Sequence, residues 1–249
     1  MTDLSYATLV VIALTFVLAG GVKGVTGMGL PTVSMGVLGI FMPPVAAASL
    51  LLVPSFVTNV WQLFTGPSFR VLLGRLWLMM LGILIGTIAG ARLLTGSDSK
   101  WTTVGLGAAL LLYALYSLFA RALTVPPRLE PWLSPVIGLA TGVTAGATGV
   151  FTLPAVPYLQ GLGLEKEDLV QAMGLSFTVS TIALAIGLTG GGAFHLADAA
   201  ISALAIIPAL AGMWIGTIVR DRISAKAFRR GFLGCLALLG LDLMIRPLL

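Results

Sequence analysis

The chain has 249 residues, of which 58% are hydrophobic and only 9% are charged. Soluble proteins carry about 25% charged residues because their surfaces face water, so this composition excludes an ordinary globular protein. The mean hydropathy of +1.06 and the long charge-free stretches predict an all-α polytopic membrane protein, since a membrane-spanning helix needs roughly 20 apolar residues.

The basic residues, which outnumber the acidic ones by 14 to 9, lie between the apolar segments. This placement is typical of residues that set membrane topology and not of a nucleic-acid-binding face, so we expect the lipid bilayer, and no nucleic acid, as a partner. The sequence contains no His-Glu-x-x-His helix, no phosphate-binding loop and no cysteine–histidine cluster. We therefore expect no enzymatic activity, no cofactor and no metal site.

Five apolar segments make up the first half of the chain. They cover residues 4–22, 30–41, 45–64, 76–94 and 101–120. A glycine-rich break, Gly24 to Gly29, separates the first two. The segment 30–41 would be ~18 Å long as a helix, too short for a ~30 Å bilayer core, so it predicts a half-helix. No basic run precedes the first segment, and we expect no cleaved signal peptide.

The second half of the chain repeats the pattern of the first. The segment 82–92 shares six of eleven residues with 212–222, and Gly24-Val25-Thr26-Gly27 aligns with Gly146-Ala147-Thr148-Gly149. Two matches in the same order indicate an internal duplication. We predict a first repeat over residues 1–122, a linker over 123–131 and a second repeat over 132–249. Each repeat would be a glycine-broken helical hairpin followed by three transmembrane helices.

The basic residues also predict how the two repeats are oriented. Lysine and arginine collect on the cytoplasmic side of membrane proteins. Inverted repeats place ten basic residues inside and three outside, with Lys23 within the membrane, whereas parallel repeats give eight and five. The sequence therefore favours two inverted repeats with both termini extracytoplasmic.

The paired breaks predict a binding site for a small anion. An unwound backbone in a membrane must be buried in protein or line an aqueous cavity, and paired breaks in the halves of a repeat are typical of transporter sites. Helix N-termini offer N–H groups to an anion. The predicted contacts in the breaks are Gly24, Thr26, Gly27, Gly29, Gly146, Thr148 and Gly149. The alternative is that these small residues only allow close helix packing.

Four further residues are predicted substrate contacts. Lys23 adjoins the first break in a charge-free region, and a cation within the membrane has an anion as its natural partner; the alternative is a lysine that snorkels to the interface. Asn59, Gln171 and Ser176 supply uncharged donors from the helices after the breaks, unless they join helix to helix. Glycine stripes at 82, 86 and 90 and at 212 and 216 indicate packing faces, toward the other half or toward a second subunit.

The arrangement of these motifs resembles the sulfite exporter TauE/SafE family over essentially the whole chain. The features that carry the resemblance are the glycine-rich breaks followed by Pro31 and Pro154, the segment Gln171-Ala172-Met173-Gly174-Leu175-Ser176, and the Gly-Thr-Ile run with an arginine. The resemblance implies a transporter of small anions, notably sulfite and sulfonated organic acids. The segment 46–49 is a weak counterpart of the Gln171 segment, so the first-half contacts are less well defined.

The sequence thus predicts a secondary transporter, an exporter or facilitator, that holds its substrate between the two breaks and works by alternating access. It would lie in the cell membrane, which is the inner membrane in a bacterium. The alternatives are an anion channel and a membrane scaffold that moves no substrate. The glycine stripes leave open whether the protein forms oligomers.

Overall fold

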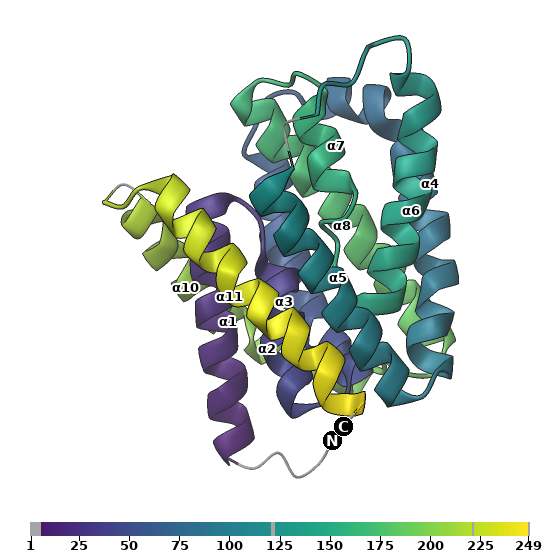
Figure 1. Ribbon diagram of the computed structural model, residues 1–249. Helices are drawn as coiled ribbons and strands as arrows, with labels where there is room; N and C mark the ends of the chain where they lie inside the picture. The colour runs from purple at the N-terminus through teal and green to yellow at the C-terminus, as the bar shows by residue number, and fades with distance from the viewer. Residues whose placement is uncertain (1–5, 121–122, 221, 249) are drawn as a thin grey trace.

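The structure, a computed structural model, describes residues 6–120, 123–220 and 222–248, without the side chains of residues 196, 197, 225 and 226. Every regular element in these ranges is a helix (Figure 1). The first half holds α1 (Tyr6–Thr26), α2 (Leu30–Phe41), α3 (Pro44–Phe64), α4 (Phe69–Gly96) and α5 (Ser99–Phe119). The second half holds α6 (Glu130–Thr148), α7 (Ala155–Gly161), α8 (Lys166–Gly190), α9 (Leu196–Leu204), α10 (Ile206–Arg220), α11 (Ala225–Ile245) and the 3₁₀ turn η1 (Arg246–Leu248).

Seven segments of the described chain are long and apolar enough to cross a membrane. They are α1, α3, α4, α5, α8, the segment Asp198–Arg220 that joins α9 to α10, and Ala227–Leu248. Three of them follow each break, as expected. The helical, polytopic membrane fold is therefore confirmed.

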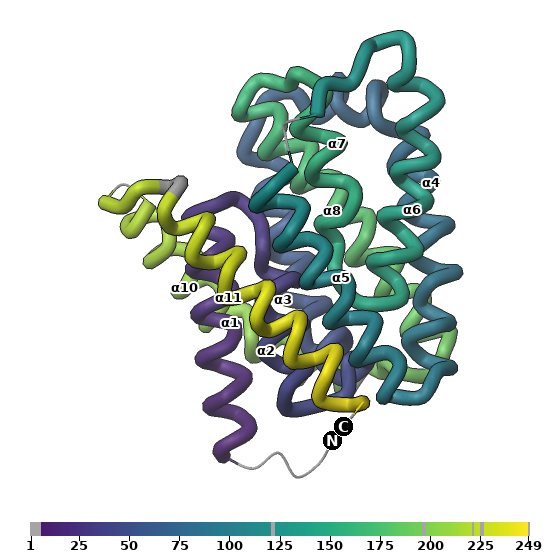
Figure 2. The backbone as a smooth tube through the Cα atoms, viewed as in Figure 1, coloured from purple at the N-terminus to yellow at the C-terminus, as the bar shows by residue number. Residues whose placement is uncertain are grey.

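Each half begins with a helix that reverses into a short second helix, and Figure 2 follows the backbone through both reversals. The second arms, α2 with 12 residues and α7 with 7, are only ~18 Å and ~10 Å long, so neither crosses a bilayer alone. Figure 1 shows that α1 starts, and α11 ends, at the end of the molecule opposite the chain between α5 and α6.

Both breaks are narrower than the sequence predicts. α1 continues through Gly24 to Thr26, and α6 continues through Gly146 to Thr148. A Cβ atom on Gly24 would overlap the carbonyl oxygen of Met213, and one on Gly146 would overlap that of Thr87. Close helix packing therefore holds these glycines in helical conformation against their low helix propensity. The expectation that Gly24 and Gly146 belong to unwound backbone is corrected accordingly.

The two halves interlock instead of forming separate lobes. α4 packs along α6 and α1 along α10, while α3 packs on α8 and α5 on α11. A Cβ atom on Gly82 would lie 2.6 Å from the carbonyl oxygen of Pro135, and one on Gly90 would lie 2.5 Å from that of Val143. Gly212 and Gly216 meet Val17 and Gly21 in the same way. Both glycine stripes thus face the other half of the same chain.

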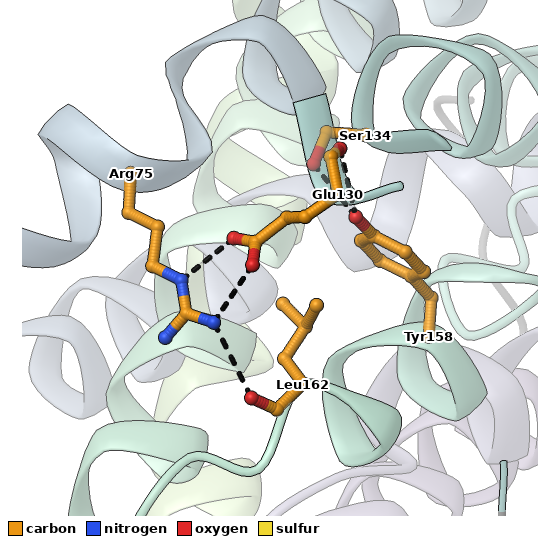
Figure 3. A network of polar contacts seen from close by, with 5 residues as sticks. All are labelled: Arg75, Glu130, Ser134, Tyr158 and Leu162. Atoms are coloured by element: carbon orange, nitrogen blue, oxygen red, sulfur yellow. Dashed lines mark hydrogen bonds and ion pairs between the residues drawn. The ribbon is translucent and has the colours of Figure 1, made fainter. Parts of the chain in front are cut away.

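A polar network ties the halves together at the end where residues 123–129 run (Figure 3). Arg75 of α4 donates to the carboxylate of Glu130 of α6 at 2.6 and 2.8 Å, and to the carbonyl oxygen of Leu162 at 3.3 Å. The hydroxyls of Ser134 and Tyr158 lie 2.7 Å apart, and that of Tyr158 also donates to the carbonyl of Glu130 at 3.3 Å. The network therefore joins α4 to both arms of the second hairpin.

Candidate functional site

Lys23 lies in the last turn of α1 and is 4% exposed. Its ammonium group donates to the hydroxyl of Thr58, at 3.2 Å, and to the side-chain oxygen of Asn59, both on α3. In the part of the chain that the structure describes, no carboxylate pairs with it. A buried cation with only neutral partners is costly, so this position favours a bound anion. The side chain points toward α3 and not away from the protein.

Asn59 links Lys23 to the second half of the chain. Its amide nitrogen lies 3.3 Å from the hydroxyl of Thr181 on α8, and that hydroxyl donates to the carbonyl of Phe177 at 2.7 Å. The hydroxyl of Thr58 donates to the carbonyl of Pro54 at 2.8 Å. Three helices, α1, α3 and α8, are thus joined around one ammonium group.

Left-handed glycines shape the ends of the breaks. Gly27, Gly29 and Gly149 have φ angles of 75°, 105° and 70°. Residues other than glycine rarely adopt these positive φ angles. Gly29 caps α2 and accepts a hydrogen bond from the N–H of Val33 at 2.8 Å. A Cβ atom on Gly149 would lie 2.8 Å from the sulfur of Met35 on α2. The second break therefore packs directly against the first hairpin.

Thr26 and Thr148 bond to the backbone of their own breaks. The hydroxyl of Thr26 donates to the carbonyl oxygens of Val22 and Met28 at 2.9 and 2.8 Å. That of Thr148 donates to the carbonyl of Thr144 at 2.7 Å and accepts from the N–H of Val150 at 3.2 Å. In this conformation both threonines stabilise helix ends, and both hydroxyls donate to backbone carbonyl oxygens.

The two glutamines connect α3 to α8. Gln171 donates to the carbonyl oxygens of Leu63 and Gly66, both at 2.7 Å, and accepts from the N–H of Ser68 at 2.9 Å. This amide therefore positions the turn after α3. Gln62 donates to the carbonyl of Gly27 at 3.0 Å, and so fixes the first break against α3.

Several buried polar atoms on the elements around the breaks have no hydrogen-bond partner among the described residues. They are Thr32 and Ser34 of α2, Ser55 and the side-chain oxygen of Gln62 of α3, Thr152 of the second break, Ser176 and Ser180 of α8, and Thr87 of α4. Leaving such a group unsatisfied costs about 1–3 kcal/mol each. Among the predicted contacts only Ser176 belongs to this set. Gln62 and Ser180 lie, like Ser176, in the helices that follow the breaks, whereas the other members are serines and threonines without a distinguishing signal in the sequence.

Residues 12–243 match the sequence model of the sulfite exporter TauE/SafE family. That range contains both breaks, Lys23 and all the helices that carry the buried hydroxyls. The chain belongs to the TauE/SafE family. It is accordingly a multi-pass membrane transport protein and not an enzyme. No curated protein and no solved structure matches the chain.

Proposed function

We propose that this TauE/SafE protein is a secondary transporter of a small anion, either sulfite or a sulfonated organic acid. The observation that carries the proposal is the burial of Lys23 beside the first break without a carboxylate partner in the described chain. The family's description as a sulfite exporter supports the choice of a sulfur oxyanion.

The substrate would lie between the two breaks. A lysine ammonium group has three N–H donors, and Thr58 and Asn59 take two of them. The third is available to an anion. The unpartnered hydroxyls of α2, α8 and the second break supply further donors, and α2 adds the first N–H groups of a helix, which have no acceptor within the helix. The three oxygens of a sulfite or sulfonate group accept several such bonds.

Transport would follow from movement of the two halves against each other, as in other inverted-repeat carriers. The halves meet along glycine faces, α4 on α6 and α1 on α10. The first helices of the two halves, α1 and α6, start at opposite ends of the molecule (Figure 1). This arrangement supports the predicted inversion of the repeats. With no phosphate-binding loop in the sequence, substrate gradients or the membrane potential would drive the movement.

Transport of radiolabelled sulfite by purified protein in liposomes tests the proposal. Preloaded sulfite should accelerate uptake from the opposite face, because a carrier exchanges substrate. Replacing Lys23 with Met should lower the rate at least tenfold, the equivalent of losing 1.4 kcal/mol. Lys100→Met, on an exposed lysine at the start of α5, is the matched control and should behave as wild type.

Two results would contradict the proposal. Single-channel currents without exchange would show a channel, and an unchanged rate in Lys23→Met would remove this lysine from the site.

A further inference from the structure

Two adjoining cavities lie between the first break and the surface at the end where residues 123–129 run. The larger has a volume of about 290 Å³, and Val25, Thr26 and Met28 of the first hairpin contribute to its wall. The smaller, of about 170 Å³, is lined by Leu123, which follows α5. Met28, Tyr113, Gln160 and Arg229 line both cavities, so the two cavities adjoin, and we call them together the vestibule.

The vestibule is positively charged. Lys166, the first residue of α8, and Arg229, in the first turns of α11, line it, and no acidic residue does. Glu165, Glu167 and Asp168 are near in sequence but outside the lining. Over the described residues, neither cation makes an ion pair. The guanidinium of Arg229 donates to the carbonyl of Ser117 at 3.5 Å, which leaves most of its five N–H donors for a ligand.

Apolar side chains of α1, α8 and α11 make up much of the wall of the larger cavity, and the neutral polar side chains of Tyr113 and Gln160 lie among them. The hydroxyl of Tyr113 lies 3.4 Å from the sulfur of Met28, a weak acceptor that competes poorly with an anion. The amide of Gln160 is exposed into the same space.

One residue of the vestibule wall is close to the buried lysine along the chain. Thr26 lies three residues after Lys23 on α1, which is a rise of ~4.5 Å along the helix. Lys23 itself lines neither cavity, but an anion in the vestibule would lie beside the last turn of α1, which carries this lysine.

We infer that the vestibule is a second anion-binding subsite, which captures the substrate through Lys166 and Arg229 before Lys23 receives it. This inference rests on the proposed function. Positively lined clefts raise the local concentration of anions and their association rate. The basic residues predict that this end faces the cytoplasm, so the vestibule would favour capture of the anion for export.

The test combines a transport measurement with a binding measurement. The double variant Lys166→Gln/Arg229→Gln removes both cations, and Arg230→Gln, on an exposed residue outside the lining, is the matched control. For sulfite presented at the vestibule face, the double variant should raise KM about tenfold and weaken its dependence on salt. The kcat, and the KM at the opposite face, should stay within twofold of wild type, as should both constants of the control.

Chemical protection measures binding without transport. Phenylglyoxal modifies exposed arginines. Methanesulfonate, which unlike sulfite does not add to the aldehyde of this reagent, should slow modification of Arg229 but not of Arg230, both in wild type and in Lys23→Met. Failure of the sulfonate to protect Arg229, or an equal rise in KM at both faces, would overturn the vestibule subsite. If the sulfonate protects Arg229 in wild type but the protein transports neither sulfite nor the sulfonate, the proposed transport function fails while the subsite stands.

Discussion

At the residue scale, the central arrangement is a charge held by neutral groups. Lys23 has the hydroxyl of Thr58 and the amide oxygen of Asn59 as its partners, and both lie on α3, the helix that follows the first hairpin. Under the proposed function such a site is preorganised for an anion, because it already contains the positive charge and no carboxylate occupies the place of the anion. Ser176 and its unpartnered neighbours fit the same interpretation.

Replacing Asn59 with Leu should lower the free energy of unfolding. The variant leaves the buried ammonium group with one neutral acceptor, so we expect a loss of about 2–3 kcal/mol in the free energy of unfolding. Adding Lys23→Met should restore most of the loss, since removing both partners of a buried polar pair is nearly neutral. Denaturation of the detergent-solubilised protein measures both; an additive, larger loss in the double variant would show that the two side chains are not coupled.

At the element scale, glycine faces decide which helices pair. Gly82, Gly86 and Gly90 on α4 meet Gly138, Gly142 and Gly146 on α6 so closely that added Cβ atoms would strike backbone. Small residues at such interfaces let helix backbones approach and gain van der Waals contact, which drives association where lipid replaces water.

The variant Gly82→Ala should separate α4 from α6 and lower the free energy of unfolding by about 1–3 kcal/mol, as overpacking does. Its control is Gly74→Ala on the same helix, where no atom lies within 4 Å of the added Cβ. That change should be neutral or stabilising by up to about 1 kcal/mol, through helix propensity alone. Equal thermal stability of the two variants would mean that the glycine face is not needed.

Several elements could be predicted from the sequence because a single local signal fixes them. The half-helix 30–41 lies between a glycine-rich break and two prolines, and α2 has the predicted bounds. By contrast, the apolar stretch 76–94 predicts only part of α4. The helix starts at Phe69 and not near Leu76, because it extends beyond the apolar residues. The extent of the breaks depends on α10 and α4, which pack on Gly24 and Gly146, and no local pattern contains that information.

The residues of the candidate site also divide into those with a local signal in the sequence and those without one. Lys23 stands out in the sequence as a cation in a charge-free region, and the structure buries it among neutral side chains. Thr58 has no such signal, because a threonine in an apolar helix usually bonds to its own backbone. Gln171 and the two threonines of the breaks have polar groups suited to a ligand, but all three bond to backbone: Gln171 to the end of α3, and each threonine to its own helix.

At the scale of the whole molecule, the chain is a single interlocked body. Helices of the first half contact helices of the second on every long interface, and the Arg75–Glu130 network adds a polar tie at one end. The helices of each repeat inferred from the sequence therefore pack mainly on helices of the other repeat, and the repeats do not form two separate blocks.

The predicted topology is open to a direct test. In a Cys235→Ser background, which removes the exposed native cysteine, single cysteines at Thr2 and Leu249 should react with a membrane-impermeant maleimide applied to intact cells. Arg128→Cys, between α5 and α6, should react only after permeabilisation, because positive residues keep that side in the cytoplasm. The reverse labelling pattern would contradict the assigned orientation.

The pairing of α1 with α10 has a consequence for how the protein is made. Gly20 and Gly24 near the start of the chain pack against Ala209 and Met213 near its end, so α1 enters the membrane long before its partner is synthesised. Contacts this distant in sequence form slowly, and segments that wait for them expose unpaired surface. During biogenesis the glycine face of α1 must therefore be covered by lipid, or by an assembly factor, until α10 has been synthesised and inserted.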